Sequence, residues 1–516
     1  MISKFRYILD GLKCLIFSFF VLCFCLTPVS LFANLDKPKN NKNRDTILSF
    51  QQEMDMRFLS FKEDSLFMPE QLQEDFLYFY KKIMETHPNP YHVINKDSMD
   101  KRVEDILKSL NKPMNRREFW LKTAVLNAYF DGHTRIFEIE EISEYNIANS
   151  KSILPEKLLM LDTSGNIYFN PKYEDVLLAG KSIKNINDIP SKQIADKVSA
   201  YYNKEHKKYS PLNFDHYFHE FYTNLFGSTD SFRFEYISDN EIDIHTFYPL
   251  EISTNSEVSH QNQQEKEKKF IRFDIYEEES IAIIKINIFI LELLGKHYRK
   301  DLETMVATIM KKNIKHLFID ISCNGGGGSN LALEILNFIK TEKKKYYTAT
   351  AEIRVSPVSC VYKLGNNFSS FVKKHRKQLY ETSNGEIMMK SDDYWKKNNS
   401  KIQYNQNLYL IQSRRTYSAA VDLSSVVKAY KLATIIGGET GGLTGCYIDS
   451  PCFAMPNTSI LFSCSVQKSV NVGGAMNGKG VLPDIEYKIE NPYKSFTLEQ
   501  LKEMLQLVEQ YKIQTK

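Results

Sequence analysis

Apolar residues recur at helical spacing where the first patterned segment begins, and this predicts a helix from about Pro69. Its apolar positions and the prolines that end it are Leu72, Phe76, Phe79, Ile83, Pro88 and Pro90. A second helix is predicted over residues 100–110. A third follows Asn115, an N-cap residue with Glu118 three places later, and ends at Gly132. Residues 67–150 are therefore expected to form a helical N-terminal domain.

The pattern changes between residues 151 and 265 to short β-type runs separated by turns, which predicts a β-rich middle domain. Residues 180–187 lead into a helical stretch and resemble the strand–helix end of a PDZ module, so we expect a PDZ-like fold. Because no Gly-Leu-Gly-Phe type loop is present, the pattern does not by itself indicate a site for a peptide carboxylate.

Strands and helices alternate over residues 266–490. The predicted strands cover 280–288, 314–321, 347–355, 407–411 and 433–436, and helices lie between them, among them 329–340 and 418–430. This succession predicts an α/β domain with parallel βαβ crossovers. The final segment, 491–516, is expected to contain an amphipathic helix over residues 497–511.

Residues 1–33 have the pattern of a secretory signal peptide. Three basic residues precede an apolar run over 14–32, and Ala33 would precede the cleavage site. We therefore expect an exported protein that is periplasmic or associated with the cell envelope. A retained membrane anchor is the alternative, because the apolar run approaches the length of a membrane span. Residues 34–66, rich in lysine and asparagine at their start, are expected to be a linker.

Length, charge and cysteine content limit the number of domains and the kinds of partner that the protein can have. A chain of 516 residues, 42% hydrophobic, predicts two or three folded domains. The net charge of +4, without a basic run, gives no support to nucleic-acid binding and favours a peptide or protein partner. Three of the eight cysteines lie in the signal segment, and the odd number left has no repeated spacing. That pattern argues against a disulfide framework and against a zinc ribbon.

Ser418, in the run Thr-Tyr-Ser-Ala-Ala, is the candidate nucleophile. It follows a predicted strand and opens a predicted helix, so its hydroxyl would project from a turn beside unpaired backbone amides. The amide of Ala419 is then a candidate oxyanion donor. Upstream, a strand runs into four glycines at 325–328, which allow close backbone approach to a substrate. No Lys-Ser/Thr pair follows these glycines, so a phosphate loop is not supported.

These motifs, with Asp-Gly-His-Thr at 131–134 and the glycine-rich runs at 437–442 and 480–484, resemble the tail-specific (C-terminal-processing) protease family of serine peptidases. The likeness is to its tricorn-like branch and covers roughly residues 70–490. It implies a ClpP/crotonase-like α/β protease domain in which His133 activates Ser418. It also implies that Gly326 or Gly327 joins Ala419 in the oxyanion hole.

The chain departs from the family pattern at several positions. No lysine lies between Lys431 and Lys468, so the lysine base of the other branch is missing. Asn477 stands where tricorn-like members have a glutamate, and Ser322 and Val421 replace a motif arginine and glutamate. Because an asparagine can orient a histidine but brings no charge, another acid could fill the role. The candidates are Asp131, Asp422, Glu439 and Asp449.

The sequence thus predicts an exported serine endopeptidase that acts on peptide or protein substrates and needs no cofactor. Two alternatives stay open: a catalytically inactive family member that binds peptides or envelope proteins, and an esterase-like acyl hydrolase. A metal site has little support, because the one ligand-like cluster has no His-Glu-x-x-His pattern. That cluster is Asp215, His216, His219 and Glu220. The sequence leaves the oligomeric state open.

Overall fold

The structure of the protein is a computed structural model. It describes residues 65–137, 158–161, 165–170, 177–203, 205–206, 218, 222, 224–227, 229–239, 241–248, 270–354, 356, 388–398, 400–489, 492 and 494–514. The predicted signal peptide and nearly all of the predicted linker lie outside these residues. Within the described ranges, no helix combines the length and the apolar character that a membrane span requires.

A six-stranded sheet forms the centre of the C-terminal part of the chain. In spatial order its strands are β19 (Ile485–Glu486), β14 (Thr434–Gly437), β13 (Asn407–Gln412), β10 (His316–Asp320), β9 (Ile281–Ile286) and β8 (Ile271–Tyr276). Neighbours from β19 to β9 pair in parallel, which confirms the predicted crossovers. β8 pairs antiparallel to β9 at the edge.

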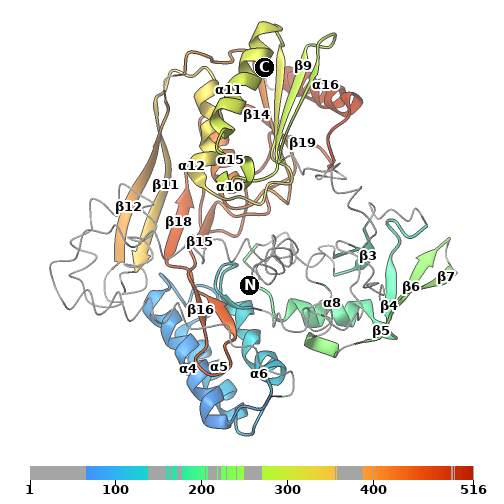
Figure 1. The fold of residues 1–516 in the computed structure, drawn as a ribbon, viewed down its shortest axis with the longest axis vertical. Helices are drawn as coiled ribbons and strands as arrows, with labels where there is room; N and C mark the ends of the chain where they lie inside the picture. The colour runs from blue at the N-terminus through green and yellow to red at the C-terminus, as the bar shows by residue number, and fades with distance from the viewer. Residues whose placement is uncertain are drawn as a thin grey trace, which may run out of the picture.

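Helices cover both faces of this sheet (Figure 1). One face packs on α11 (Tyr298–Lys311), α12 (Ser329–Leu333) and α15 (Ala419–Ala429), and the other packs on α16 (Leu498–Gln514). Alternate residues of β9 pack against the helices on the two opposite faces of the sheet. Ile284 of β9 lies in the first core and Ile283 in the second. Because both faces are buried, the strands read as continuous apolar runs rather than as alternating ones.

A four-stranded antiparallel sheet, absent from the sequence prediction, stands beside the helical layer. Its order is β12 (Met388–Lys396), β11 (Lys345–Arg354), β18 (Gln467–Asn471) and β15 (Gly445–Ile448). The predicted strand over 347–355 is confirmed as β11. Its partner β18 is more than 100 residues away in sequence, so no local pattern indicates the pairing.

The predicted N-terminal helices are confirmed as α4 (Pro69–Thr86), α5 (Lys96–Ser109) and α6 (Arg116–Thr123). Asn115 and Glu118 form the expected capping box of α6. The third helix is shorter than predicted, because Ala124–Tyr129 forms a 3-10 helix, η2. The Asn127 amide exchanges hydrogen bonds with both backbone groups of Ile136, which fixes this turn through a tertiary contact.

A hairpin from the C-terminal part of the chain completes the N-terminal helical unit. Its strands, β16 (Cys452–Ala454) and β17 (Leu461–Ser463), form a three-stranded sheet with β1 (Arg135–Ile136). The hairpin side chains Phe453 and Phe462 belong to the same core as the helices. Residues far apart in sequence therefore build one packing unit.

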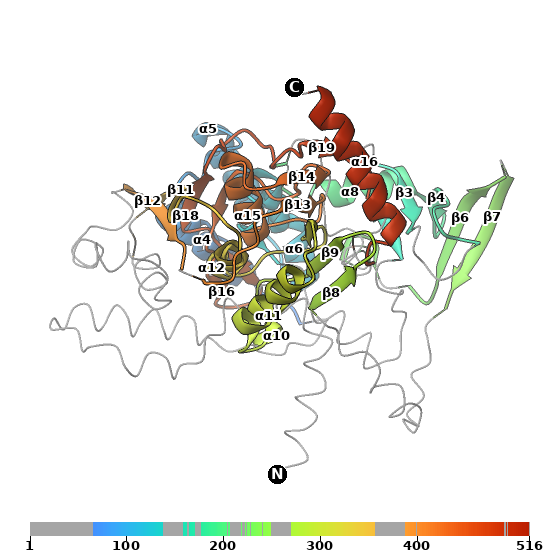
Figure 2. The ribbon, with the colours of Figure 1, turned by 90° about the horizontal axis from the view of Figure 1, so that it is seen from above.

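The middle of the chain is β-rich, as predicted. β2 (Leu159–Leu161) pairs with β3 (Ile167–Phe169), and a second sheet follows the order β5 (Ile189–Pro190), β4 (Ile183–Ile186), β6 (Phe232–Ser238) and β7 (Glu241–Phe247). Helix α8 (Ser191–Ser199) follows β5 directly. β6 and β7 lie on the opposite side of the molecule from β11 and β12 (Figure 2). The PDZ-like identity of this region stays a prediction.

Candidate active site

Ser418 occupies a strained turn between β13 and α15. Its φ of 50° and ψ of −127° lie in a region that residues other than glycine rarely adopt. Although Ser418 is the N-cap residue of α15, its side chain makes no capping hydrogen bond. The hydroxyl is therefore left available for chemistry, which separates Ser418 from an ordinary capping serine.

The glycine run packs directly against this turn. A Cβ added at Gly326 would lie 2.5 Å from the Ser418 Cβ and 2.8 Å from the Tyr417 carbonyl oxygen. The Tyr417 amide also donates to the Asn324 carbonyl oxygen at 3.0 Å. Gly326 has a φ of 108°, so both the space and the backbone conformation require glycine there.

The backbone amides of the two loops define a candidate oxyanion hole. Ala419 is the first residue of α15, and its amide has no partner within the helix. In the glycine run, the Gly326 amide donates to Asn324 Oδ1 and the Gly328 amide donates to the Phe289 carbonyl oxygen, both at 2.8 Å. The amides of Gly325 and Gly327 have no acceptor among the described residues. The oxyanion roles stay predictions, and the geometry favours Gly327 over Gly326.

A buried ion pair supports the base of the glycine run. Lys285 Nζ donates to Asp320 Oδ2 at 2.6 Å, and Asp320 Oδ1 accepts from the Ser322 amide at 2.8 Å. The loop that leads to Asn324 is thus fixed even though Ser322 stands at the position of the expected arginine.

His133 follows η2 in a loop that is fastened to strand β17. Its carbonyl oxygen accepts from Ser463 Oγ at 2.6 Å, and the next residue, Thr134, accepts through Oγ1 from the Ser465 amide at 2.9 Å. The His133 ring faces the Tyr417 ring, with their centroids 6.1 Å apart. The structure therefore brings His133 alongside the Ser418 turn, although more than half the chain separates them in sequence.

Asp131 is the acid nearest to the His133 ring. Its Oδ1 lies 4.0 Å from His133 Nδ1 and accepts from the His133 amide at 2.8 Å. Its Oδ2 lies 2.8 Å from His87 Nε2. Burial alone would raise the pKa of Asp131, but the hydrogen bond from His87, together with His133 and Thr134, holds this pKa well below its usual range. Asp131 is therefore a carboxylate at neutral pH.

The position expected for the orienting group does not reach the histidine. Asn477 is exposed, and its Oδ1 accepts from the Lys479 amide at 3.1 Å. Of the four acids considered from the sequence, Asp131 has an oxygen 4.0 Å from a ring nitrogen of His133. Two of the others make contacts elsewhere: Asp422 accepts from Ser329 and Asn471, and Glu439 accepts from the Gly480 amide.

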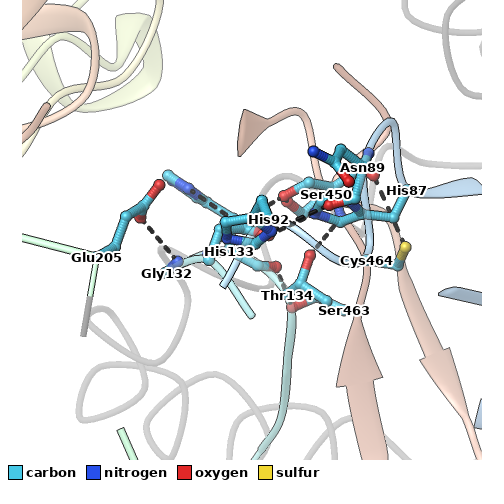
Figure 3. Close-up of polar contacts among 12 residues, drawn as sticks. His87, Asn89, His92, Gly132, His133, Thr134, Glu205, Ser450, Ser463 and Cys464 are labelled. Carbon is cyan, nitrogen blue, oxygen red and sulfur yellow. Dashed lines mark hydrogen bonds and ion pairs between the residues drawn. The ribbon is translucent and has the colours of Figure 1, made fainter. Parts of the chain in front are cut away.

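Glu205 is a further acid at this site, and no sequence motif marks it. The residue follows the middle domain's helix α8, and its Oε2 accepts from the Gly132 amide at 3.1 Å (Figure 3). Burial, followed by the charge of Asp131, raises the pKa of Glu205 to about 8. Burial and the charge of Glu205 also raise the pKa of Tyr417. The middle domain thus touches the loop that carries His133.

No group of three or more metal-ligating side chains occurs in the part of the chain that the structure describes. The ligand-like cluster at 215–220 lies outside it.

Comparison with known protein families gives a match for the C-terminal part of the chain. The model of peptidase family S41 matches residues 280–487. No curated protein sequence matches the chain. Among solved structures, mature CPAF complexed with lactacystin has a TM-score of 0.55 at 12% identity, covering 86% of this chain and 99% of that one. At this identity the likeness shows the fold alone.

Two further solved structures match with lower TM-scores. The photosystem II D1 C-terminal processing protease has a TM-score of 0.46 at 14% identity and covers 84% of this chain and 97% of that one. Tricorn protease has a TM-score of 0.33 at 12% identity, with coverage of 86% and 37%.

Proposed function

The chain belongs to peptidase family S41, the tail-specific serine peptidases, through residues 280–487, and on that premise we propose that it is an endopeptidase with Ser418 as nucleophile and His133 as base. The observation that carries this assignment is the strained Ser418 turn, whose hydroxyl does not cap its helix and which packs against Gly326 beside the His133 ring.

In the proposed reaction His133 takes the proton of the Ser418 hydroxyl as the oxygen attacks a peptide carbonyl carbon. The amides of Ala419 and Gly327 donate hydrogen bonds to the oxyanion that forms. The histidine then gives its proton to the leaving amine. In the second half His133 takes a proton from a water molecule that attacks the acyl carbon, and it returns this proton to Ser418 Oγ as the bond to the acyl group breaks and the carboxylic acid leaves. This chemistry uses residues of the chain and no cofactor.

A fluorophosphonate probe tests the nucleophile. The wild-type protein is expected to label at Ser418 and to cleave an unfolded protein substrate. Ser418→Ala is expected to lose labelling and to lose turnover at least about a thousandfold. Ser424→Ala is the matched control, because Ser424 lies on the same helix, is buried, and has no hydrogen-bond partner for its hydroxyl in the described structure. Labelling that survives in Ser418→Ala would refute the assignment.

A second candidate function is a silent, peptide-binding family member. Asn477, Val421 and Ser322 favour it, because each departs from the family pattern. Binding of peptides without Ser418-dependent turnover would support that function. Turnover of esters with no cleavage of peptides would instead support an acyl hydrolase.

We further propose that the protein is exported to the periplasm or cell envelope, since residues 1–33 have the pattern of a signal peptide. The intact mass of the protein from its native host tests this proposal. Cleavage after Ala33 is expected, and a mass that includes residues 1–33 would indicate a retained anchor.

A further inference from the structure

We propose that Asp131 orients His133 in place of Asn477, and that His87 is a second positioning residue that holds Asp131. This inference rests on the proposed function, since it concerns the base of that reaction. Asn477 is exposed and engaged by Lys479, while His133 Nδ1 is buried without a hydrogen-bond partner in the described structure. A ring nitrogen in that state needs an acceptor, and Asp131 Oδ1 is 4.0 Å away.

The protonation of His87 follows from its two ring contacts. The Asn89 amide donates to His87 Nδ1 at 3.0 Å, so Nδ1 carries a lone pair. The ring proton of neutral His87 is therefore on Nε2, which donates to Asp131 Oδ2 at 2.8 Å. His87 thus presents a fixed N–H donor to the carboxylate.

The surroundings of His87 prevent the ring from turning. His87 is fully buried and follows the last turn of α4, where its amide donates to the Ile83 carbonyl oxygen. Its ring stacks on His92 at 5.5 Å and contacts the Tyr447 ring at 4.6 Å. The donor to Asp131 is therefore held from both the N-terminal helices and strand β15.

The two oxygens of Asp131 have separate tasks in this arrangement. Oδ2 is occupied by His87, which keeps Oδ1 directed toward the His133 loop. Oδ1 accepts from the His133 amide and from Ser465 Oγ, both at 2.8 Å. The proposed contact requires a rotation of the His133 ring that shortens the 4.0 Å between Nδ1 and this oxygen to hydrogen-bond distance. That contact keeps His133 Nε2 unprotonated as the base, and it stabilises the imidazolium that forms when Ser418 gives up its proton.

Several other titratable groups face Asp131, and they enter any pH dependence. Glu205 approaches from the middle domain, and the other groups come from the α4–α5 connection and from the protease domain. Within the described residues these groups are His87, His92, His133, Glu205, Tyr417, Cys446, Tyr447 and Cys464. Substitutions at His87 change none of these other side chains chemically, and both amide variants remove the ring contacts with His92 and Tyr447, so a difference between their pH profiles reports on the donor to Asp131.

Two amides at position 87 test the inference in the full-length protein. The side-chain nitrogen of His87→Gln reaches the place of Nε2 and can still donate to Asp131. His87→Asn instead places its oxygen near Nδ1, where it accepts from Asn89 but leaves Asp131 without its donor. We expect kcat of His87→Asn to fall about 10–100-fold with KM within about twofold of wild type. We expect His87→Gln to keep kcat within about threefold.

The pH profile of kcat/KM distinguishes positioning from a general structural effect. Losing a hydrogen-bond donor raises the proton affinity of the Asp131–His133 pair, so the acid limb of His87→Asn should move to higher pH by about half a unit or more. The acid limb of His87→Gln should stay in place. Equal losses of kcat in both variants without a shift of the acid limb would overturn the inference, as would a wild-type profile in His87→Asn.

Two controls keep this test independent of folding and of the proposed function. If His87→Asn fails to fold, His87→Gln still tests the positioning role of His87, because a tenfold loss of kcat in that variant contradicts the inference. Turnover that depends on Ser418 in the wild-type protein establishes the proposed function separately. With that turnover present, an unchanged His87→Asn removes only the positioning role.

Discussion

At the scale of single residues, the absence of a side chain at Gly326 decides whether the Ser418 turn can form. Ser418 has a positive φ and its side chain makes no capping hydrogen bond, so its strained backbone needs support from its surroundings. Contact with the glycine run supplies that support: a Cβ at Gly326 would overlap the Ser418 turn. Strain of this kind persists only where the surroundings determine it.

Gly326→Ala is therefore expected to lower kcat at least about 100-fold, because it displaces Ser418 and the oxyanion donors together. Gly325→Ala is the matched control. A Cβ at Gly325 meets nothing within 4 Å, so this variant should retain activity within about threefold. Steady-state kinetics on folded, purified variants measures both. Similar activity in the two variants would show that the close approach of Gly326 is not needed.

At the residue scale, the sequence predicted the candidate site residues that belong to local motifs. Ser418, His133 and the glycine run each follow a recognisable pattern of strand, turn and helix. The contact between Asp131 and His87 has no such mark, because it depends on α4 and the 131–134 loop meeting in space. Glu205 reaches the same loop from a different domain, which no spacing indicates.

At the scale of elements, the β16–β17 hairpin holds the His133 loop against the protease domain. β17 pairs with β1, two residues after His133, and Ser463 binds the His133 carbonyl oxygen. The turn of the hairpin is fixed by the buried Asp75 of α4. Asp75 accepts from the amides of Asn457 and Thr458 and from the Thr458 hydroxyl.

Asp75→Ala should destabilise the protein by about 2–4 kcal/mol, because it leaves several buried donors without an acceptor. The measured quantity is the free energy of unfolding in denaturant. Glu74→Gln is the control: Glu74 accepts one exposed hydrogen bond from the Asn457 side chain, so its loss should cost less than about 1 kcal/mol. Equal effects of the two substitutions would contradict the role given to Asp75.

The contact between the middle domain and the His133 loop should depend on pH. Burial, followed by the charge of Asp131, raises the pKa of Glu205 from its ordinary value of 4.5 to about 8, so the folded protein binds an extra proton between these pH values. Stability from this residue is full below pH 4.5 and is lost as pH rises through about 8. Glu205→Gln keeps an acceptor for the Gly132 amide and cannot ionise, and it should remove this loss.

Thermal unfolding at pH 4.5 and pH 8.5 measures the effect, because the loss of stability begins as the pH rises above 4.5. The Glu205→Gln protein should be more stable than wild type at the higher pH and similar to it at the lower. Glu241→Gln, which removes an exposed carboxylate of the same domain, controls for net charge. Parallel behaviour of wild type and Glu205→Gln at both pH values would contradict a buried, proton-binding Glu205.

Element-scale prediction succeeded where periodicity is local and failed where pairing is distant. The helices α4 and α15 and the parallel strands follow from apolar spacing and caps. The antiparallel sheet and the hairpin do not, because their partners are brought together only by the finished fold. The 3-10 helix η2 is likewise fixed by a contact outside its own turn, between Asn127 and the backbone of Ile136.

At the scale of the whole molecule, the proposed nucleophile and the proposed base come from parts of the chain that are far apart in sequence. Ser418 belongs to the helical layer of the protease domain, and His133 belongs to the N-terminal unit that the β16–β17 hairpin completes. Catalysis should therefore depend on the packing of that hairpin more than on the stability of the protease core.

Phe462 offers a direct test of this dependence. It lies opposite Ile136 in the β1–β17 pair, and its ring meets the Phe79 ring edge-on at 5.1 Å. Phe462→Ala should cost about 3–5 kcal/mol and also lower kcat per labelled active site, because the His133 loop loses its support. Leu501→Ala, in the α16 core, should cost a similar free energy while kcat per labelled site stays near wild type. Denaturant unfolding and fluorophosphonate-titrated kinetics give both quantities, and an unchanged kcat in Phe462→Ala would show that the active site does not rely on the hairpin.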